Sequence, residues 1–279
     1  ALGLAALGAR VVVNDFGGAQ DGSGGSSDQA IKVVAEIEAA GGEAMADAAD
    51  VTDSGAVERM IAAALDRWGR VDILVNNAGI LRDKSFVKME AADFRKVVDV
   101  HLYGAVNCTK AVWDTMRTQE YGRIVFTSSG SGLYGNFGQS NYGAAKTAMI
   151  GLMNVLAVEG EKYGIRVNCL APTAATRMTE GLLSPEELER MQPEVITPGL
   201  LYLLSEDGPT RTILSAGAGV FSRTIIRETE GFYLAPSDRS PDAVAAAFAQ
   251  DADTNGLHDI AGAFDQTRRF LEKAAAATQ

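Results

Sequence analysis

Three side chains are spaced for proton transfer to or from a hydroxyl group. Tyr142 and Lys146 lie four residues apart in TSSGSGLYGNFGQSNYGAAK (127–146), so on a helix they share one face. A tyrosine has a pKa of about 10 and is a poor base at neutral pH, but a nearby ammonium group favours the phenolate and lowers that pKa. Ser129 lies thirteen residues before Tyr142, just past a predicted strand, where open sheets bind ligands. The three residues predict an acid–base site.

These residues need a scaffold, and the apolar pattern predicts one of alternating strands and helices. Strands are expected at 11–13, 43–48, 71–75, 123–127, 165–170 and 213–220, and helices at 28–40, 54–68, 91–118 and 141–163. This alternation predicts an α/β fold, a Rossmann-like doubly wound parallel sheet in three layers. Two more helices are expected at 241–250 and 259–277. Residues 1–220 are therefore interpreted as one α/β domain, and 221–279 as a helical C-terminal extension that packs on this domain or on a partner subunit.

The beginning of the chain raises a separate expectation. The sequence opens ALGLAALG, a helical stretch, and then enters a strand at 11–13. In a Rossmann-like sheet, the first strand and its glycine-rich phosphate loop precede such a helix. We therefore expect both to be missing from the given sequence. The stretch GGAQDGSGG at 17–25 follows the second strand and lacks phosphate-loop spacing, so it is interpreted as a surface loop.

Composition narrows the class of ligand. The net charge is −11 and the pI is near 4.7, which argues against a nucleic-acid or anionic-membrane surface. Two cysteines and two histidines provide neither a disulfide framework nor a metal site. No apolar run reaches the roughly 18 to 20 residues that span a bilayer. These features predict a cytoplasm-like reducing compartment and small-molecule partners, with no metal, nucleic acid or membrane.

The motifs together resemble the short-chain dehydrogenase/reductase family over about residues 1–220. The matching residues are Asn76, Asn77, Ala78, Gly79, Ser129, Tyr142, Lys146, Pro172 and Thr176. Within the family, NDFGG, NNAGILRDKSF, YGNFGQSNYGAAK and RMT resemble the (3R)-hydroxyacyl-CoA dehydrogenase domains of type 2 multifunctional enzymes. The resemblance implies reversible oxidation of an alcohol by hydride transfer to a nicotinamide. It also implies a homodimer or homotetramer and, in a eukaryote, a peroxisomal-type matrix.

The resemblance also implies roles for the catalytic residues. Tyr142 is the general acid/base, Lys146 lowers its pKa and binds the nicotinamide ribose, and Ser129 binds the substrate oxygen. In VDVHLYG, His101 stands where most relatives carry an asparagine of a proton relay, and the type 2 enzymes also have histidine there. We interpret His101 as a member of such a proton relay or as a residue that supports the site. The alternative is a hydrogen-bonded core histidine.

The cofactor-binding residues implied by the resemblance lie at other strand ends. One part of this group is the turn Asn76-Asn77-Ala78-Gly79. The resemblance places Asp50 and Val51 at the adenine. It places three further residues beside the nicotinamide, namely Pro172, Ala174 and Thr176. Thr173 replaces a usual glycine there, which affects how the backbone approaches the nicotinamide. Instead of binding adenine, Asp50-Val51 could simply precede a helix capped by Thr52 or Asp53.

Asp15 predicts the choice of cofactor. A carboxylate at the end of the second strand accepts hydrogen bonds from ribose hydroxyls and repels a 2′-phosphate, and neither Phe16 nor Gly17 is cationic. The alternative is a simple Asx turn. Together with the resemblance, this gives the interpretation of an NAD-dependent dehydrogenase that acts on a 3-hydroxyacyl thioester linked to CoA. Three alternatives stay open: a hydroxysteroid dehydrogenase, a 3-oxoacyl carrier-protein reductase, which Asp15 disfavours, and a non-catalytic binding protein.

Overall fold

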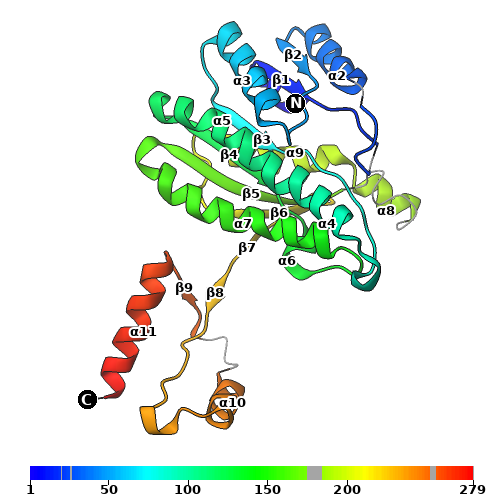
Figure 1. Cartoon of the computed structure of the whole chain (residues 1–279). Coiled ribbons are helices and arrows are strands. Elements are labelled where there is room, and N and C mark those ends of the chain that lie inside the picture. Colours follow the sequence, from blue (N-terminus) through cyan, green and yellow to red (C-terminus); the bar gives the residue numbers. More distant parts are fainter. Residues whose placement is uncertain (20, 26, 175–183, 252–255, 279) are drawn as a thin grey trace. The chain divides into compact units, whose positions relative to one another are not determined.

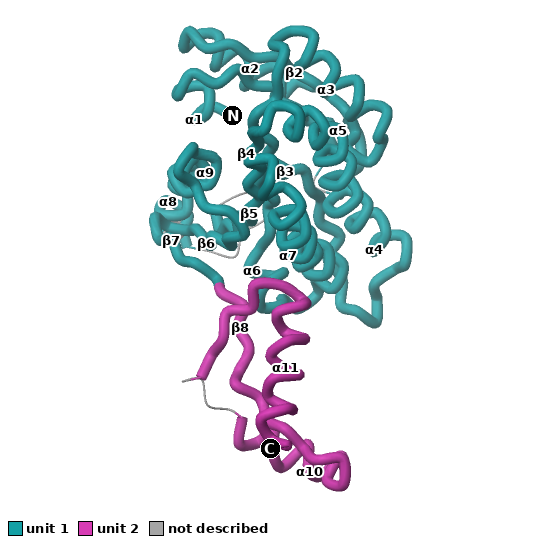
Figure 2. Tube along the Cα trace, turned by 90° about the vertical axis from the view of Figure 1, so that its left-hand side faces the viewer, with its two compact units in different colours: residues 1–224 teal, residues 225–279 magenta. Residues whose placement is uncertain are grey.

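Strands and helices alternate along most of the chain, as the apolar pattern predicts (Figure 1). The structure is a computed structural model that describes residues 1–19, 21–25, 27–174, 184–251 and 256–278. The chain divides into two compact units, Ala1–Thr224 and Ile225–Gln279, which Figure 2 shows in two colours. The candidate site residues all belong to the first unit.

Two sheets form the centre of the first unit. One pairs β1 (Val11–Asn14) with β2 (Ala44–Asp47) in parallel. The other has the order β3-β4-β5-β6-β7. Its strands are β3 (Ile73–Asn76), β4 (Gly122–Thr127), β5 (Ile165–Thr173), β6 (Ile213–Gly217) and β7 (Val220–Thr224). Strands β3 to β6 are parallel. The predicted Rossmann-like α/β class is confirmed.

Helices cover both faces of the five-stranded sheet. In the first unit they are α1 (Leu2–Ala6), α2 (Asp28–Ala39), α3 (Ser54–Trp68), α4 (Ala91–Val98), α5 (Gly104–Gln119), α6 (Gly130–Tyr134), α7 (Ser140–Gly160), α8 (Pro185–Arg190) and α9 (Thr197–Leu204). Figure 2 shows α5 and α7 on one side of β3, β4 and β5, and α9 on the other. This gives the three layers that the sequence predicts.

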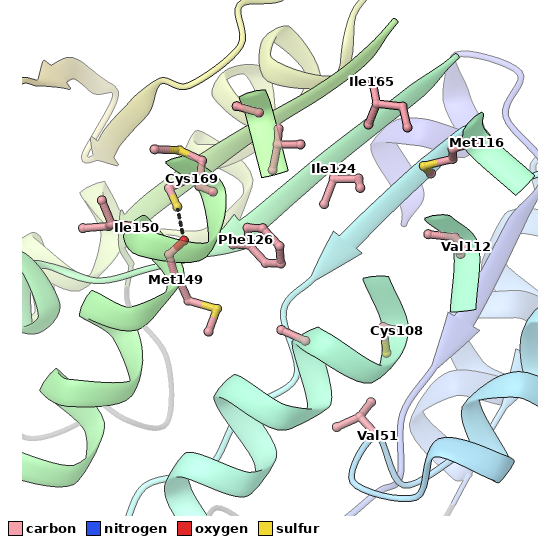
Figure 3. Close-up of a cluster of buried hydrophobic side chains, with 14 of the residues drawn as sticks. Val51, Cys108, Val112, Met116, Ile124, Phe126, Met149, Ile150, Ile165 and Cys169 are labelled. Carbon is pink, nitrogen blue, oxygen red and sulfur yellow. Dashed lines mark hydrogen bonds between the residues drawn. The ribbon is translucent and has the colours of Figure 1, made fainter. Parts of the chain in front are cut away.

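The largest core cluster lies between the sheet and the helices α3, α5 and α7 (Figure 3). Ile124 and Phe126 on β4 are completely buried, and Val125 between them is buried in a second cluster on the other face. A strand covered on both faces reads as a continuous apolar run, which is why β4 was predictable. Each such large side chain contributes about 2 kcal/mol of burial free energy. The core therefore fixes the strand ends that carry the candidate site.

Two predicted elements of the first unit differ from the structure. The expected helix at 91–118 is α4 and α5 joined by a π-helical segment, Asp99–Tyr103. The expected strand at 213–220 turns at Ala218 and Gly219, both with positive φ, and returns as antiparallel β7. Strand β7 ends at Thr224, which is also the last residue of the first compact unit. No helix among the described residues is long and apolar enough to cross a membrane.

The second unit is small and open. It contains β8 (Arg227–Glu228), α10 (Pro241–Gln250), β9 (His258–Asp259) and α11 (Ala263–Ala277). The expected helix at 259–277 starts later because residues 258–259 pair with β8. None of the unit's described residues is buried. Exposed ion pairs such as Arg227–Asp259 at 2.7 Å connect its segments. Ion pairs of this kind contribute little to the free energy of folding. How the extension packs stays a prediction.

Candidate active site

The end of β4 and the beginning of α7 bring together the serine, tyrosine and lysine. Ser129 follows β4 and is the N-cap of α6, and its hydroxyl accepts a hydrogen bond from Ser131 N at 3.2 Å. Tyr142 lies in the first turn of α7 and Lys146 one turn later. Gly132 allows α6 to approach this turn, because a Cβ there would lie 2.7 Å from the Cβ of Lys146. The predicted shared helix face of Tyr142 and Lys146 is therefore present.

Lys146 is buried and its ammonium group is held from one side. Its Nζ donates to the carbonyl oxygen of Thr127 at 2.6 Å and lies 5.5 Å from the ring centroid of Tyr142. Burial lowers the pKa of Lys146 to about 7. Among the residues that the structure describes, Thr127 O is the one hydrogen-bond partner of the Lys146 ammonium group. The remaining N–H groups fit the hydroxyls of a ribose, since an ammonium has three donors.

The pKa of Tyr142 departs from the expectation. Burial raises it, a hydrogen bond with Ser129 lowers it, and the charge of Asp83 raises it further. The sequence predicts that Lys146 lowers the pKa of Tyr142, but in this structure the pKa of Tyr142 is raised. The physical reason is that burial disfavours the phenolate, and the same burial leaves Lys146 only partly charged at neutral pH.

His101 lies on the π-helical segment and packs against Tyr142. The two ring centroids are 5.2 Å apart and the planes cross at 86°. His101 Nε2 lies 3.1 Å from Ile80 N and 2.8 Å from Ile80 O, while Nδ1 is buried without a partner among the described residues. Burial and then the charge of Lys146 lower the pKa of His101 to about 3. The ring is therefore neutral, and a Cβ at Gly79 would overlap it.

Thr127 connects the turn after β3 to the catalytic helix. Its hydroxyl donates to Asn77 Oδ1 at 3.0 Å, and its carbonyl binds Lys146. Asn76 donates to the Thr109 hydroxyl at 3.3 Å, and Ala78 and Gly79 follow in the same turn. The sequence interpretation missed Thr127. The available signal was a polar residue at the end of an otherwise apolar strand.

Asp15, Asp50 and Val51 lie at the carboxyl ends of β1 and β2. Asp15 is exposed, and its Oδ1 accepts from Gly17 N at 2.7 Å, so the Asx turn is present. Asp50 Oδ1 accepts from the backbone and the hydroxyl of Thr52 at 2.9 and 2.8 Å. The N-cap of α3 is Asp53. Val51 is buried, and its carbonyl accepts from Asn107 Nδ2 at 2.9 Å.

The remaining predicted residues lie at the end of β5. Pro172 and Thr173 pair with Ala216 and Gly217 of β6, and Ala174 follows them. Thr176 lies outside the described residues. Strand β5 therefore contributes Pro172 and Ala174 at the same sheet edge as Ser129, because the carboxyl ends of parallel strands share one edge.

Asn141 is a second residue that the sequence interpretation missed. It is fully buried, donates to Arg82 O at 3.0 Å and accepts from Tyr142 N at 2.8 Å. A buried amide with both ends used orients its neighbours. Asn141 therefore ties the beginning of α7 to the loop after β3. Its position directly before Tyr142 was the signal.

The sequence matches the family described as short chain dehydrogenase over residues 1–187. The chain belongs to this family, and it is accordingly an oxidoreductase acting on CH–OH groups. It is 47% identical over 251 residues to peroxisomal multifunctional enzyme A of Dictyostelium discoideum, covering 90% of this chain and 56% of that protein. It is 46% identical to a short-chain type dehydrogenase/reductase of Mycobacterium tuberculosis, covering 94% of this chain and 91% of that one.

Solved structures are similar as well. Full-length peroxisomal multifunctional enzyme type 2 from Drosophila melanogaster has a TM-score of 0.78 at 34% identity, covering 94% of this chain and 48% of that one. A 7α-hydroxysteroid dehydrogenase in complex with NADH and 7-oxo glycochenodeoxycholic acid has a TM-score of 0.69 at 29% identity, covering 78% and 87%. The chain thus spans about half the length of its multifunctional relatives.

Proposed function

We propose that this chain is an NAD-dependent dehydrogenase that interconverts a secondary alcohol and a ketone, with a 3-hydroxyacyl-CoA as substrate. The observation that carries the proposal is the arrangement of Ser129, Tyr142 and Lys146 on a short-chain dehydrogenase scaffold. Ser129 acts to lower the pKa of Tyr142, and the ring centroid of Tyr142 lies 5.5 Å from Lys146 Nζ. This arrangement serves proton transfer at an alcohol oxygen.

In the oxidation direction, Ser129 donates a hydrogen bond to the substrate oxygen and stabilises the charge that develops there. Tyr142 takes the hydroxyl proton as general base, and in reduction it returns that proton. Lys146 binds the ribose hydroxyls and, when charged, favours the phenolate. A bound nicotinamide supplies the hydride acceptor. His101 packs on the Tyr142 ring and holds its orientation.

NAD rather than NADP is proposed on the basis of Asp15. Its Oδ1 is used by Gly17 N, while the second carboxylate oxygen remains for the adenosine ribose hydroxyls. A 2′-phosphate would meet that negative charge, and neither Phe16 nor Gly17 compensates for it. Asp50 and Val51 would lie at the adenine. Asn76, Asn77, Ala78 and Gly79, together with Pro172, Ala174 and Thr176, would lie along the rest of the cofactor.

The acyl-CoA substrate is proposed from the relatives and from the loops beside Tyr142. Lys84 N donates to Gly138 O at 2.9 Å, so the loop after β3 and the segment before α7 lie together. These two segments expose Phe86 and Phe137, at 77% and 90% of their surface. Exposed aromatic side chains next to a reaction centre suit an apolar acyl chain. The names of the multifunctional relatives support a peroxisomal-type matrix. A homodimer or homotetramer is proposed from the family resemblance alone.

One kinetic panel tests the proposal. Purified protein is assayed with NAD and NADP, each with 3-hydroxyacyl-CoA substrates and hydroxysteroids, alongside Tyr142→Phe. The highest kcat/KM is expected with NAD and a 3-hydroxyacyl-CoA, with negligible turnover by Tyr142→Phe. Higher kcat/KM with a steroid would support the second candidate function, which the likeness to the 7α-hydroxysteroid dehydrogenase favours. A preference for NADPH and a 3-oxoacyl carrier protein would support the reductase alternative.

A further inference from the structure

The loop after β1 begins at the residue proposed to select the cofactor, and it folds back on itself. This Asp15 loop comprises residues 15–19 and 21–25 among those that the structure describes. Ala19 N donates to Ser23 O at 2.7 Å. A Cβ at Gly25 would lie only 3.2 Å from Phe16 O. The two arms of the Asp15 loop therefore lie together, so a contact that fixes its tip also restrains its first residues.

The tip of the Asp15 loop contacts two side chains of the loop after β3. Arg82 Nε donates to the carbonyl oxygen of Asp21 at 2.9 Å. Gly22, at φ 81°, lies against Ile80, because a Cβ there would come within 3.1 Å of Ile80 Cδ1 and Cγ2. Ile80 is buried, and the side chain of Arg82 is 28% exposed. These two side chains therefore hold the tip of the Asp15 loop.

The guanidinium group of Arg82 is fixed on its other side by an acidic residue of α4. Arg82 Nη1 donates to Asp93 Oδ1 at 2.9 Å, and the side chain of Asp93 is 15% exposed. A guanidinium group presents its donors in a rigid plane, so a bond at Nη1 restricts the direction in which Nε points. Asp93 thereby aims Arg82 Nε at the carbonyl oxygen of Asp21.

The backbone of the same segment is bonded to the proton-transfer site. Ile80 N and O lie 3.1 and 2.8 Å from His101 Nε2, and the His101 ring packs on Tyr142. Arg82 O accepts from Asn141 Nδ2 at 3.0 Å, and Asn141 Oδ1 accepts from Tyr142 N at 2.8 Å. At these two positions the loop after β3 therefore uses its backbone towards Tyr142 and its side chains towards the Asp15 loop.

We propose that Arg82 is a positioning residue for cofactor selection. By holding the tip of the Asp15 loop, it keeps the Asp15 carboxylate in place for the adenosine ribose and so sets the preference for NAD over NADP. The inference rests on the proposed cofactor role of Asp15, through which Arg82 acts. The physical reason is that a loop already held in its binding conformation loses less freedom when a ligand binds.

Arg82→Met tests this link, because it removes both side-chain hydrogen bonds and keeps the backbone contact with Asn141. In the whole chain without cofactor, amide hydrogen exchange in the Asp15 loop should become faster. The dissociation constant for NAD should rise about threefold to tenfold, as expected for the loss of a hydrogen bond. The preference for NAD in kcat/KM should fall by a similar factor, while kcat at saturation should stay within about twofold. A general loss of stability would not produce this division between affinity and kcat.

Lys84→Met is the matched control. It removes a cation from the same loop and from the same carboxylate, because Lys84 Nζ lies 3.0 Å from Asp93 Oδ2. The other ion-pair partner of Lys84 is Glu90 rather than the Asp15 loop. Hydrogen exchange in the Asp15 loop and the affinity for NAD should therefore stay as in the parent. Unchanged exchange in Arg82→Met, or an equal acceleration in Lys84→Met, overturns the inference.

A second pair of variants disturbs the contact from the side of the Asp15 loop and leaves Arg82 in place. Gly22 and Gly24 both have positive φ, 81° and 77°, so alanine strains the backbone similarly at either position. A Cβ at Gly22 would press on Ile80, whereas a Cβ at Gly24 meets no described atom within 4 Å. Gly22→Ala should therefore weaken NAD binding more than Gly24→Ala. Equal dissociation constants in the two variants would contradict the inference.

A double-mutant cycle tests whether Arg82 acts through Asp15. Arg82→Met should weaken NAD binding less in an Asp15→Ala background than in the parent. Additive losses of affinity would show that Arg82 acts by another route and would overturn the inference. Failure of the inference and failure of the proposed function can be distinguished. Unchanged hydrogen exchange refutes the role of Arg82 alone, since that measurement involves no cofactor, whereas equal kcat/KM with NAD and NADP in the parent refutes the cofactor role of Asp15.

Discussion

The two parallel sheets of the first unit carry candidate site residues in contrasting surroundings. At the edge of the five-stranded sheet, Lys146 is buried and joined to Thr127, and Tyr142 packs on His101. At the edge of the two-stranded sheet, Asp15 is exposed, and its carboxylate accepts a hydrogen bond from Gly17 N of its own turn. The first edge can change a pKa because it excludes water. The second edge can recognise a ligand by hydrogen bonds and charge but cannot alter its chemistry. Substitutions should therefore affect turnover at one edge and cofactor selectivity at the other.

The largest effect is expected from Tyr142→Phe. The variant keeps the ring that packs on His101 and removes the proton-transfer group, so kcat should fall by about 10³-fold or more. NAD affinity, measured by fluorescence titration, should stay within a few-fold of the parent. A kcat of one tenth of the parent at saturating substrate would show that Tyr142 is not the acid/base.

Lys146→Met comes next, because Lys146 is assigned both proton chemistry and ribose binding. Turnover should fall by about 10²-fold or more, and NAD affinity should fall with it. Unlike turnover, the free energy of unfolding should be higher in the variant than in the parent at low pH. The folded pKa of about 7 lies below the unfolded value of 10.5, so the unfolded parent binds the extra proton between these values. Its free energy of unfolding therefore rises with pH across this window by up to about 1.4 kcal/mol per unit.

In Lys146→Met this slope should be absent, and below pH 7 the variant should be more stable than the parent. Urea unfolding at several pH values, without cofactor, measures the difference. An identical pH dependence of the free energy of unfolding in the two proteins would contradict the assignment of a burial-lowered pKa.

Asp15→Ala sharpens the contrast at the exposed edge. The parent is expected to prefer NAD by at least about 30-fold in kcat/KM, equivalent to about 2 kcal/mol. The variant should narrow this ratio mainly by losing NAD affinity, with little change in kcat at saturation. Equal efficiency with both cofactors in the parent would refute the role of Asp15.

The predicted assembly is checked without a substitution. The parent is expected to sediment as a homodimer or homotetramer at micromolar concentration. Sedimentation as a monomer would refute that prediction.

His101→Asn should have the smallest effect on turnover, within about tenfold, because the family resemblance implies that an asparagine can fill this position. The substitution should instead change how the free energy of unfolding depends on pH. The folded pKa of about 3 lies below the unfolded 6.5, so the unfolded parent binds one more proton in this window. The free energy of unfolding of the parent should fall on acidification from 6.5 towards 3, by up to about 1.4 kcal/mol per unit. The variant should lack that contribution when both are unfolded in urea at each pH.

Local chemistry explains how far the sequence predicted this structure. Helix α3 was predicted with its observed bounds because Asp53 caps its start and Gly69, at φ 75°, ends it. The spacing of Tyr142 and Lys146 lies within one helix turn, so it needed no knowledge of the fold. Contacts between distant segments gave no such signal. Arg82 and Asp21 are separated by 61 positions in the sequence, and their pairing follows only from how two loops pack.

The interrupted helix before β4 shows the same limit. Nothing in the residues around His101 marks the change from α4 to the π-helical segment Asp99–Tyr103. Likewise, the sequence interpretation did not predict the turn at Ala218 and Gly219. The glycine was a usable signal, because it can adopt the positive φ of 76° that this turn requires. Periodicity predicts that a segment is helical or extended, but tertiary packing decides where it bends.

The π-helical segment also constrains how this protein can vary in length. A π-turn encloses one more residue than an α-turn, so deletion of one residue within Asp99–Tyr103 would restore an uninterrupted α-helix from α4 into α5. Because the wider turn takes up the additional residue, α4 and α5 would keep their faces towards the rest of the fold after such a deletion. The placement of the segment's own side chains would change instead, and with it the contact of His101 with the Tyr142 ring. A change of one residue in length at this point should therefore spare the core and affect the candidate active site.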